Sequence, residues 1–319
     1  MLIVRDLAHL PPHAQGMALA IGNFDGLHRG HRAVLSAMQA SAAEQKIQSA
    51  VLTFTPHPRR FFAPDAPPLA LEPFHVRMRR LRALGVDHMY LTRFTPELSQ
   101  MTAEAFVTEI LVARLRVRHV TTGENFVFGR GRSGDADFLA RMAKQYEFGY
   151  HAVASQQVAG QEYASSHVRA ALRAGEMAKA AEILGRPYEL CGRVRHGENR
   201  GEALGYPTAN IIPTGLLLPA FGVYAARYCV SEPLMPETTP QTWQPAVAYL
   251  GTRPTYGGER AWLEVHALDA SENLYGKRLR VQLVAYVRPD ATFASDAALQ
   301  TQIAVDISQA KQHLEHINA

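Results

Sequence analysis

The sequence predicts a chain of two domains, in which a parallel α/β sheet is followed by a small antiparallel β-barrel with a terminal helix. In the first part of the 319 residues, short apolar segments alternate with segments of helical period, which is typical of βαβ units. After residue 185, strand-like segments follow one another across Gly- and Pro-rich turns, which is typical of a small antiparallel barrel. We therefore expect one domain over residues 1–185 and a second over residues 186–319.

The parallel sheet is predicted from apolar segments of strand length. They occupy residues 19–22, 51–54, 89–92, 119–123 and 151–153. Residues 102–115 carry Phe106, Ile110 and Leu111 at helical spacing, so we expect a helix with one apolar face there. Ligands gather where parallel strands end at one edge of a sheet. The turns at residues 22–31, 55–58 and 123–132 are therefore expected to surround one cleft.

The barrel is predicted from a second series of strands and a final helix. The strand-like segments are residues 190–194, 222–230, 246–250, 261–268 and 278–287, and residues 232–244, rich in Pro and Thr, read as a flexible hairpin loop. A helix over residues 296–316 places apolar side chains at helical spacing and should pack over the barrel: Leu299, Ile303, Ile307 and Leu314.

Composition and charge exclude several classes of protein. Hydrophobic residues make up 47% of the chain, enough for a core in each domain, and the formal net charge of +4 suits small anionic substrates. The basic run at residues 77–82 reads as the solvated face of a helix, so no nucleic-acid partner is expected. Cys191 and Cys229 lack the spacing of a disulfide framework or a zinc site. With no targeting segment or membrane span, we expect a cytoplasmic protein without a membrane partner.

The segment GNFDGLHRGH at residues 22–31 is the most informative motif. Gly22 and Gly30 allow a sharp turn and a close approach to phosphate between a strand and a helix. His28 and His31 are three residues apart, so they share one face of the first helical turn, where the helix dipole favours an anion. An isolated motif of this kind is also compatible with ordinary histidines that face solvent or pack in the core. The strand before it and the helix after it indicate a site for the triphosphate of ATP or CTP.

Motifs in both halves together resemble the bifunctional prokaryotic riboflavin kinase / FAD synthetase family. In the first half they are residues 22–31, 54–58, 123–126, 128–130 and 165–169; in the second half they are residues 205–210, 222–224, 251–255, 263–266 and 274–277. The junction at residues 184–188 is also similar to that of the family. The resemblance implies a Rossmann-like nucleotidyltransferase domain that makes FAD, joined to a barrel kinase domain that makes FMN, both using ATP and Mg²⁺.

For FAD synthesis, the resemblance assigns ATP contacts to the histidine motif and to a second motif near residue 165. His28 and His31 contact the triphosphate, and Asn125 serves the metal and phosphates as a neutral oxygen donor. The other ATP-binding residues are Gly22, Phe24, Asp25, Gly30, Ser166 and Arg169. Ala164 stands where the pattern of the second motif has its first Ser, and Ser166 where it has Thr. A hydroxyl thus remains at the key position.

The flavin of this first site is expected beside the turn after the second predicted strand. Its candidate residues are Phe54, His57, Pro58 and Phe62. For Phe54, ordinary packing in the core of the sheet is the alternative reading.

For riboflavin phosphorylation, the chemistry requires a positioned carboxylate, because a ribityl hydroxyl is a poor nucleophile until its proton is shared or removed. Glu264 is the candidate base, since an acid in the largely apolar segment 263–268 is costly if it faces the interior without a purpose. Strand alternation alone also allows Glu264 to face solvent. Thr208 and Asn210 flank Ala209, so both point to one side of an extended segment and offer oxygen ligands to Mg²⁺.

A glycine-rich loop in the second domain is expected to cover the nucleotide, with Gly192, His196, Gly197 and Gly201 as its residues, although lone glycines of this kind are usually ordinary turn residues. The resemblance adds Arg288 as a contact of the flavin. Asp290 replaces the Glu that is more usual in the family, which leaves the contacts of that flap open.

Two other functions are compatible with parts of the pattern. A nucleotidyltransferase for another phosphorylated metabolite would keep His28 and His31 but would not explain Thr208, Asn210 and Glu264. A non-catalytic flavin-binding regulator would be expected to lack the metal and base residues. The sequence makes no prediction about the oligomeric state.

Overall fold

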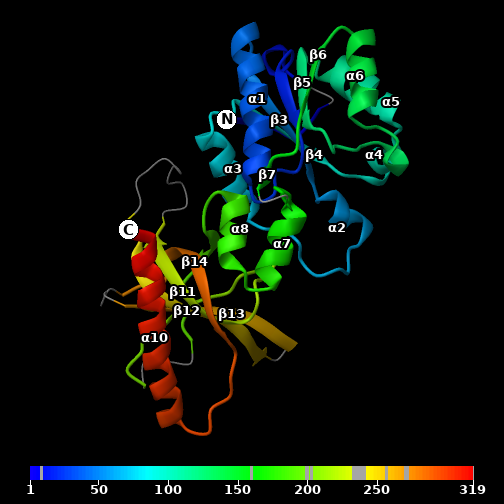
Figure 1. Ribbon diagram of the computed structural model, residues 1–319. Helices are drawn as coiled ribbons and strands as arrows, with labels where there is room; N and C mark the ends of the chain where they lie inside the picture. Colours follow the sequence, from blue (N-terminus) through cyan, green and yellow to red (C-terminus); the bar gives the residue numbers. More distant parts are fainter. Residues whose placement is uncertain are drawn as a thin grey trace. The chain divides into compact units, whose positions relative to one another are not determined.

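The computed structural model describes residues 1–7, 10–158, 161–197, 201, 204–231, 242–255, 258–268 and 273–318. It divides into two compact units, Met1–Pro67 with Phe74–Ala164, and Pro68–Pro73 with Ser165–Ala319. Each unit is built on one main sheet (Figure 1).

The first unit contains a six-stranded sheet in the order β1-β4-β3-β2-β5-β6, and all neighbouring strands are parallel. The strands are β1 (Leu2–Val4), β2 (Ala18–Ile21), β3 (Ser49–Thr55), β4 (His88–Arg93), β5 (His119–Gly123) and β6 (Gly149–Val153). The chain runs outward from β2 through β3 and β4, and then returns to pair β5 with β2. The carboxyl end of β2 is therefore the switch point of the sheet, where open α/β sheets bind ligands.

Helices cover both faces of this sheet. The longer ones are α1 (Arg29–Gln45), α3 (Phe74–Ala83) and α6 (Ala136–Gln145). The short helical segments are η1 (Pro12–Ala14), α2 (Pro58–Phe62), α4 (Pro96–Gln100), α5 (Ala103–Ala105) and η3 (Arg130–Arg132). The strands β7 (Gln157–Val158) and β8 (Gln161–Glu162) form a separate hairpin. Alternate residues of β2 enter opposite cores. Ala18 and Ala20 pack with Leu35 of α1, whereas Leu19 and Ile21 pack with residues of α6 and the segment after α5.

The structure confirms a helix in the predicted range 102–115, but most of it is a π-helix. After α5 it continues as η2 (Phe106–Arg114), a π-helix whose wider turn gives hydrogen bonds such as Leu115 N to Ile110 O. Phe106, Ile110 and Leu111 are buried on one side, as the spacing predicts.

The second unit contains a curled antiparallel sheet in the order β10-β13-β12-β11-β14-β9. Its strands are β9 (Tyr188–Arg193), β10 (Ala209–Ile211), β11 (Gly222–Val230), β12 (Gln244–Thr255), β13 (Gly258–Ala267) and β14 (Arg278–Pro289). Beyond β9, Arg195 N donates to Asn210 O of β10 at 2.8 Å, which brings the two edges of the sheet together. This confirms the predicted barrel-like architecture.

In the described part of the second unit, helices α7 (Ser165–Arg173), α8 (Met177–Leu184) and α10 (Asp296–Asn318) accompany the sheet. The terminal helix α10 packs along β11, β12 and β14, as the sequence predicts, and is drawn in red in Figure 1. The pair α7 and α8 also belongs to this unit. Ala220 N donates to Leu172 O at 2.9 Å, and a Cβ placed at Gly175 would lie 3.2 Å from the ring of Tyr286. Compactness thus groups α7 and α8 with the barrel, whereas the boundary predicted at residue 185 would separate them from it.

The remaining sequence-based expectations have mixed outcomes. The basic run on α3 is not a wholly solvated face, because Arg80 is only 7% exposed. Cys191 and Cys229 are not joined by a disulfide bond. Most of the hairpin loop predicted at residues 232–244 lies outside the described residues. Across the ranges that the structure describes, we find no helix with both the length and the apolar character needed to cross a bilayer.

Candidate active sites

The turn between β2 and α1 is shaped by positive backbone angles. Phe24, Gly26 and Leu27 have φ values of 51°, 81° and 41°. The two non-glycine residues are strained in this region, and burial of both side chains offsets that cost. The turn delivers His28 to the N-cap position of α1, at the switch point of the sheet.

His28 and His31 lie together at the beginning of α1, as the spacing predicts. Their rings stack with centroids 3.6 Å apart, and the Nδ1 atom of His28 accepts a hydrogen bond from His31 N at 3.3 Å. Because Nδ1 accepts, a neutral His28 ring carries its proton on Nε2 and presents a donor there. Gly30 has to be glycine, since a Cβ would lie 2.8 Å from Tyr163 O. The arrangement suits a phosphate at the N-terminus of a helix.

Arg77 supports the same turn, which sequence reasoning missed. Its Nη1 atom donates to Asn23 O at 2.8 Å, and its guanidinium lies 5.9 Å from the ring centroid of Phe74. The contact joins α3 to the residue before Phe24. No local sequence pattern predicts the contact between Arg77 and Asn23, because the two residues are 54 positions apart.

An aromatic cluster follows β3 in the first unit. Phe94 lies between Phe54 and Phe62, 5.9 Å from each ring centroid, and Phe61 joins the cluster at 5.1 Å from Phe94. Phe62 is 66% exposed, and Phe54 packs partly against the core. The structure therefore brings Phe54 and Phe62, two predicted flavin residues, into one partly exposed aromatic cluster, and adds the half-buried Phe61 and Phe94, which the sequence analysis did not select.

The turn after β3 also holds His57 and Pro58. His57 caps α2 with its Nδ1 atom accepting from Arg59 N at 3.1 Å, and Pro58 is the first residue of that helix. Both side chains thus have a local structural role at the carboxyl end of β3.

Asn125 follows β5 at the same edge of the sheet. Its Nδ2 atom donates to Ser155 Oγ at 2.9 Å and lies 3.4 Å from Glu162 Oε1. With the amide nitrogen engaged in this way, the amide oxygen points elsewhere and suits a cation. The Glu162 carboxylate is a second oxygen group beside it that sequence reasoning missed.

Ser166 and Arg169 lie in α7, within the second unit. Ser166 is exposed in the first turn, whereas Arg169 is buried and its Nε atom donates to Leu69 O at 2.8 Å. Arg169 thereby fastens the segment Pro68–Pro73 to the helix pair.

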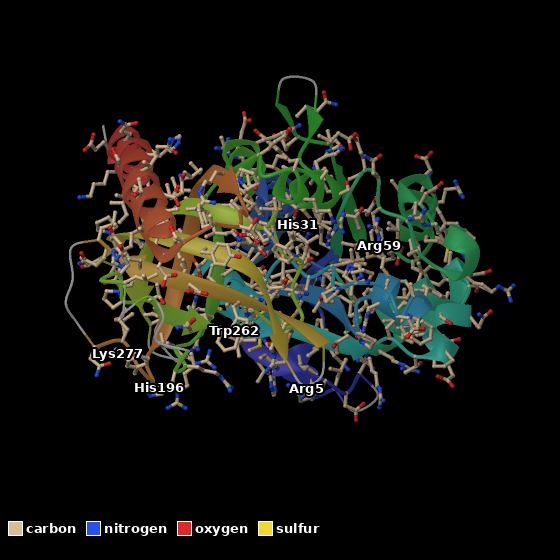
Figure 2. All side chains as sticks on the ribbon, turned by 90° about the horizontal axis from the view of Figure 1, so that it is seen from below. Arg5, His31, Arg59, His196, Trp262 and Lys277 are labelled. Carbon is tan, nitrogen blue, oxygen red and sulfur yellow. The ribbon has the colours of Figure 1, made fainter. Side chains whose placement is uncertain are left out.

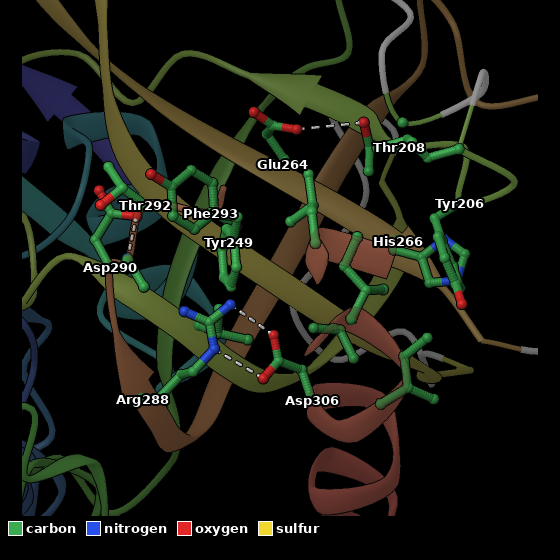
Figure 3. Close-up of a pocket in the computed structure, with 18 of the residues that line it drawn as sticks. Tyr206, Thr208, Tyr249, Glu264, His266, Arg288, Asp290, Thr292, Phe293 and Asp306 are labelled. Carbon is green, nitrogen blue, oxygen red and sulfur yellow. Dashed lines mark hydrogen bonds and ion pairs between the residues drawn. The ribbon is translucent and has the colours of Figure 1, made fainter. Parts of the chain in front are cut away.

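A cavity of about 600 Å³ in the second unit unites most of the residues predicted for riboflavin phosphorylation. Figure 3 shows Glu264 and Thr208 at one end, and Arg288 with Asp306 at another. The walls between them are largely apolar and come from β11, β12, the segment after β14, and α10: Val223, Val247, Phe293, Leu299, Ile303 and Ile307. An aromatic ligand with a polar tail fits such a lining.

Glu264 faces this cavity, so the alternative that it faces only solvent is wrong. Its strand neighbours Leu263 and Val265 are buried on the opposite side of β13. Thr208 Oγ1 donates to Glu264 Oε2 at 3.5 Å, and Asn210 pairs with Glu264 across β10 and β13. The base candidate and both metal candidates therefore share one end of the cavity.

Asn210 has the features of a cation ligand. It is 4% exposed, and its Oδ1 atom is buried with no hydrogen-bond partner among the described residues, whereas Nδ2 donates to Thr208 O at 3.3 Å. A buried oxygen without a partner costs free energy unless something binds it. Together with the Thr208 hydroxyl it suits Mg²⁺, which prefers oxygen ligands and shares them with substrate phosphates.

His266 holds the segment that carries Thr208. Its Nδ1 atom lies 2.9 Å from Pro207 O, so Nδ1 carries a proton and donates it, and its ring meets Tyr206 edge to face at 5.5 Å. His266 lies two residues beyond Glu264 on the same side of β13, and it lines the cavity (Figure 3).

The residues predicted to cover the nucleotide occupy different kinds of structure. Gly192 lies within β9, where a Cβ would be 2.3 Å from Ile211 Cγ2, so the expectation that it belongs to a loop is wrong. His196 is exposed in the following loop, stacks on Tyr275 at 4.1 Å, and is labelled with Lys277 in Figure 2. Gly201 lines the cavity, and Tyr206 N donates to its carbonyl at 2.8 Å.

Arg288 reaches the cavity from the end of β14 and forms an ion pair with Asp306 of α10. Its Nε and Nη2 atoms each donate to a carboxylate oxygen at 2.8 Å. Asp290 lines the cavity close by, with Oδ1 accepting from Ala291 N at 2.9 Å. Sequence reasoning selected Arg288 and missed Asp306.

Comparison with known proteins agrees with this geometry. A profile described as FAD synthetase matches residues 10–167, and one described as riboflavin kinase matches residues 184–314. The bifunctional riboflavin kinase/FMN adenylyltransferase of Escherichia coli (strain K12) is 36% identical over 315 residues, which is 98% of this chain and 97% of that protein. Its namesakes from Pseudomonas fluorescens and Haemophilus influenzae are 38% and 33% identical, again over 98% of this chain and 97% and 98% of theirs.

A solved structure shares the fold over almost its full length. It is titled as a macrolide-efflux protein from Streptococcus pneumoniae, has a TM-score of 0.83 and 24% sequence identity, and the match covers 97% of this chain and 98% of that one. At this identity the likeness concerns the fold alone. The sequence matches decide the family, and the chain belongs to the bifunctional riboflavin kinase/FMN adenylyltransferase family.

Proposed function

We propose that the two reactions of this family take place at separate sites, with riboflavin phosphorylated in the cavity of the second unit and FMN adenylylated at the carboxyl edge of the first unit's sheet. As a member of the family, the chain is a riboflavin kinase and FMN adenylyltransferase that uses ATP. The observation that carries the proposal is the end of the cavity where Glu264, Thr208 and the buried Oδ1 of Asn210 meet.

In the kinase reaction, Glu264 accepts the proton of the terminal ribityl hydroxyl as the hydroxyl oxygen attacks the γ-phosphorus of ATP, the bond from that phosphorus to the β–γ bridging oxygen breaks, and ADP leaves. A positioned general base of this kind contributes about 10²–10⁴-fold. Thr208 and Asn210 would hold Mg²⁺, and the metal supplies charge neutralisation for the phosphates when it is bound. The apolar walls exclude water from the flavin ring, and Arg288 lies beside that ring.

In the adenylyltransferase reaction, a phosphate oxygen of FMN attacks the α-phosphate of ATP, and pyrophosphate leaves. The phosphate is already a competent nucleophile, so the protein has to orient two anions and neutralise the charge that develops on the leaving group. His28 and His31, at the positive end of α1, supply donors for that charge. Loss of one such contact typically costs about 10²–10³ in rate.

Other residues complete the first site in this proposal. Gly22, Phe24, Asp25 and Gly30 shape and line the nucleotide turn, and Asn125 would hold Mg²⁺ with its amide oxygen. The assignment of Ser166 and Arg169 to the ATP phosphates remains a prediction from the resemblance of their motif, and both residues lie in α7 of the second unit. The flavin ring lies against the aromatic cluster, with Phe54, His57, Pro58 and Phe62 as its contacts.

The proposal includes His196, Gly192 and Gly201 as the nucleotide side of the kinase site. A domain boundary near residue 185, a cytoplasmic location, and the lack of nucleic-acid and membrane partners remain predictions from the sequence.

A hydroxyl deletion tests the proposed metal site. Thr208→Val should raise the Mg²⁺ concentration that half-saturates FMN formation and lower its maximum rate, because one oxygen ligand is lost. The matched control is Thr301→Val, whose exposed hydroxyl donates to Ala297 O of the same helix. FMN and FAD are separated by chromatography. Equal behaviour of the two variants would remove Thr208 from the site.

A further inference from the structure

The Arg288–Asp306 ion pair lies at the wall of the cavity that also carries apolar side chains. Asp306 is 4% exposed in its side chain and Arg288 is 20% exposed, and both line the cavity beside apolar residues. A third partner, Gln302, donates from Nε2 to Asp306 Oδ1 at 2.9 Å. The neighbours on α10 that line the same wall are Ile303 and Ile307. A carboxylate in this position needs an explanation beyond the packing of a helix.

Stability alone is a weak explanation for such a pair. Removing two charges from water is expensive, and a buried ion pair is often no more stabilising than apolar side chains of similar volume. Val284, Ala310 and Leu314 already provide an apolar contact between the same helix and the sheet. The pair is therefore expected to serve the cavity that it borders.

The contacts fix the plane of the guanidinium. Nε and Nη2 are bound to the two oxygens of Asp306, and Nη1 donates to Pro289 O at 2.9 Å. With all three nitrogens engaged, the flat faces of the guanidinium offer the largest remaining contact area to a ligand. One face already lies 5.5 Å from the ring centroid of Phe293. Figure 3 shows the guanidinium of Arg288 held against Asp306 at the wall of the cavity.

We propose that Asp306 is a positioning residue for the flavin: it holds the Arg288 guanidinium in the orientation whose flat face stacks on the isoalloxazine ring. A guanidinium stacks well on aromatic systems because it is planar and weakly hydrated, and a fixed one loses little entropy on binding. The inference rests on the proposed placement of riboflavin in this cavity. It predicts that Asp306 affects the KM for riboflavin rather than kcat or the KM for ATP.

The test separates positioning from mere structure with three variants of the full chain: Asp306→Asn, Arg288→Met, and the two combined. Arg288→Met should lower the melting temperature most, because it leaves a buried carboxylate without its cation. The double variant should recover the melting temperature, since no buried charge remains. Its KM for riboflavin should nevertheless stay about tenfold above wild type, as should that of each single variant, the size expected for a lost desolvated cation–π contact.

A double variant with recovered melting temperature and wild-type KM for riboflavin would overturn the inference and leave the pair a purely structural link. Glu315→Gln, an exposed acid on the same helix, is the matched control and should change neither quantity. Val247→Trp tests the proposed placement of riboflavin separately, because the larger side chain would occupy part of the cavity that Val247 lines. If Val247→Trp leaves the KM for riboflavin unchanged, the flavin lies elsewhere, and the proposed kinase site fails together with the inference.

Discussion

Gly197→Ala should damage the kinase site by displacing Asn210. A Cβ at position 197 would lie 2.5 Å from Nδ2 and 2.8 Å from Cγ of Asn210. Ordinary contacts between such atoms begin near about 3.5 Å, so a movement of about 1 Å is required. The backbone before position 197 is held, because Arg195 N donates to Asn210 O and Gly276 N donates to Val194 O. We therefore expect the side chain of Asn210 to move.

The expected magnitude follows from that displacement. A misplacement of about 1 Å at a reacting centre costs on the order of 10²-fold in rate. The same overpacking lowers the free energy of unfolding by about 1–3 kcal/mol. We expect FMN formation from riboflavin to fall about 10²-fold in kcat/KM and to need more Mg²⁺. FAD formation from supplied FMN, measured on the same preparation, should stay at the wild-type rate because it uses the other unit.

A double-mutant cycle shows whether Gly197→Ala acts through Asn210. Asn210→Ala removes the side chain that the new methyl group would meet, so adding Gly197→Ala to it should cost little more. Kinase activity close to wild type in Gly197→Ala, or full additivity of the two changes, would refute the reasoning.

Three further outcomes follow from the structure. Glu264→Asp withdraws the carboxylate by one carbon–carbon bond, about 1.5 Å, and should lower kcat for FMN formation about 10²-fold with little change in the KM for riboflavin; an unchanged kcat would exclude it as the base. A fragment of residues 165–319 should melt higher than one of residues 183–319, because α7 and α8 pack on the barrel; equal melting temperatures would show that the helix pair adds nothing. Arg77→Met should lower the rate of FAD formation from FMN, whereas the exposed Arg82→Met should not, since only Arg77 bonds to the nucleotide turn; identical rates would reduce Arg77 to a surface charge.

Much of the fold is predictable because buried strands and amphipathic helices leave a periodic pattern. The segments at residues 119–123 and 222–230 match β5 and β11 to the residue. The short strands β1 and β10 have three residues each, too few for a pattern, and their pairing comes from the neighbouring strands. The π-helical hydrogen bonds of η2 are likewise invisible in a spacing that both helix types satisfy.

The candidate sites were predictable where their residues share a motif. His28 with His31, and Thr208 with Asn210, are close in sequence and end up close in space. The supporting residues were not predictable, because their partners are distant: Asp306 meets Arg288 from 18 positions away. Arg80 was predicted to face solvent because it is charged, but its side chain is buried, which charge alone does not reveal.

The most direct test of two independent sites is to assay both reactions in two variants, His28→Ala/His31→Ala and Glu264→Gln. The account predicts that the histidine variant loses FAD formation from FMN by on the order of 10² or more, while FMN formation from riboflavin stays near the wild-type rate. Glu264→Gln should show the reverse pattern, with FMN formation lost by on the order of 10²-fold and FAD formation from supplied FMN retained. A parallel fall of both activities in either variant, with the chain still folded by its melting curve, would contradict the assignment of the two reactions to separate sites.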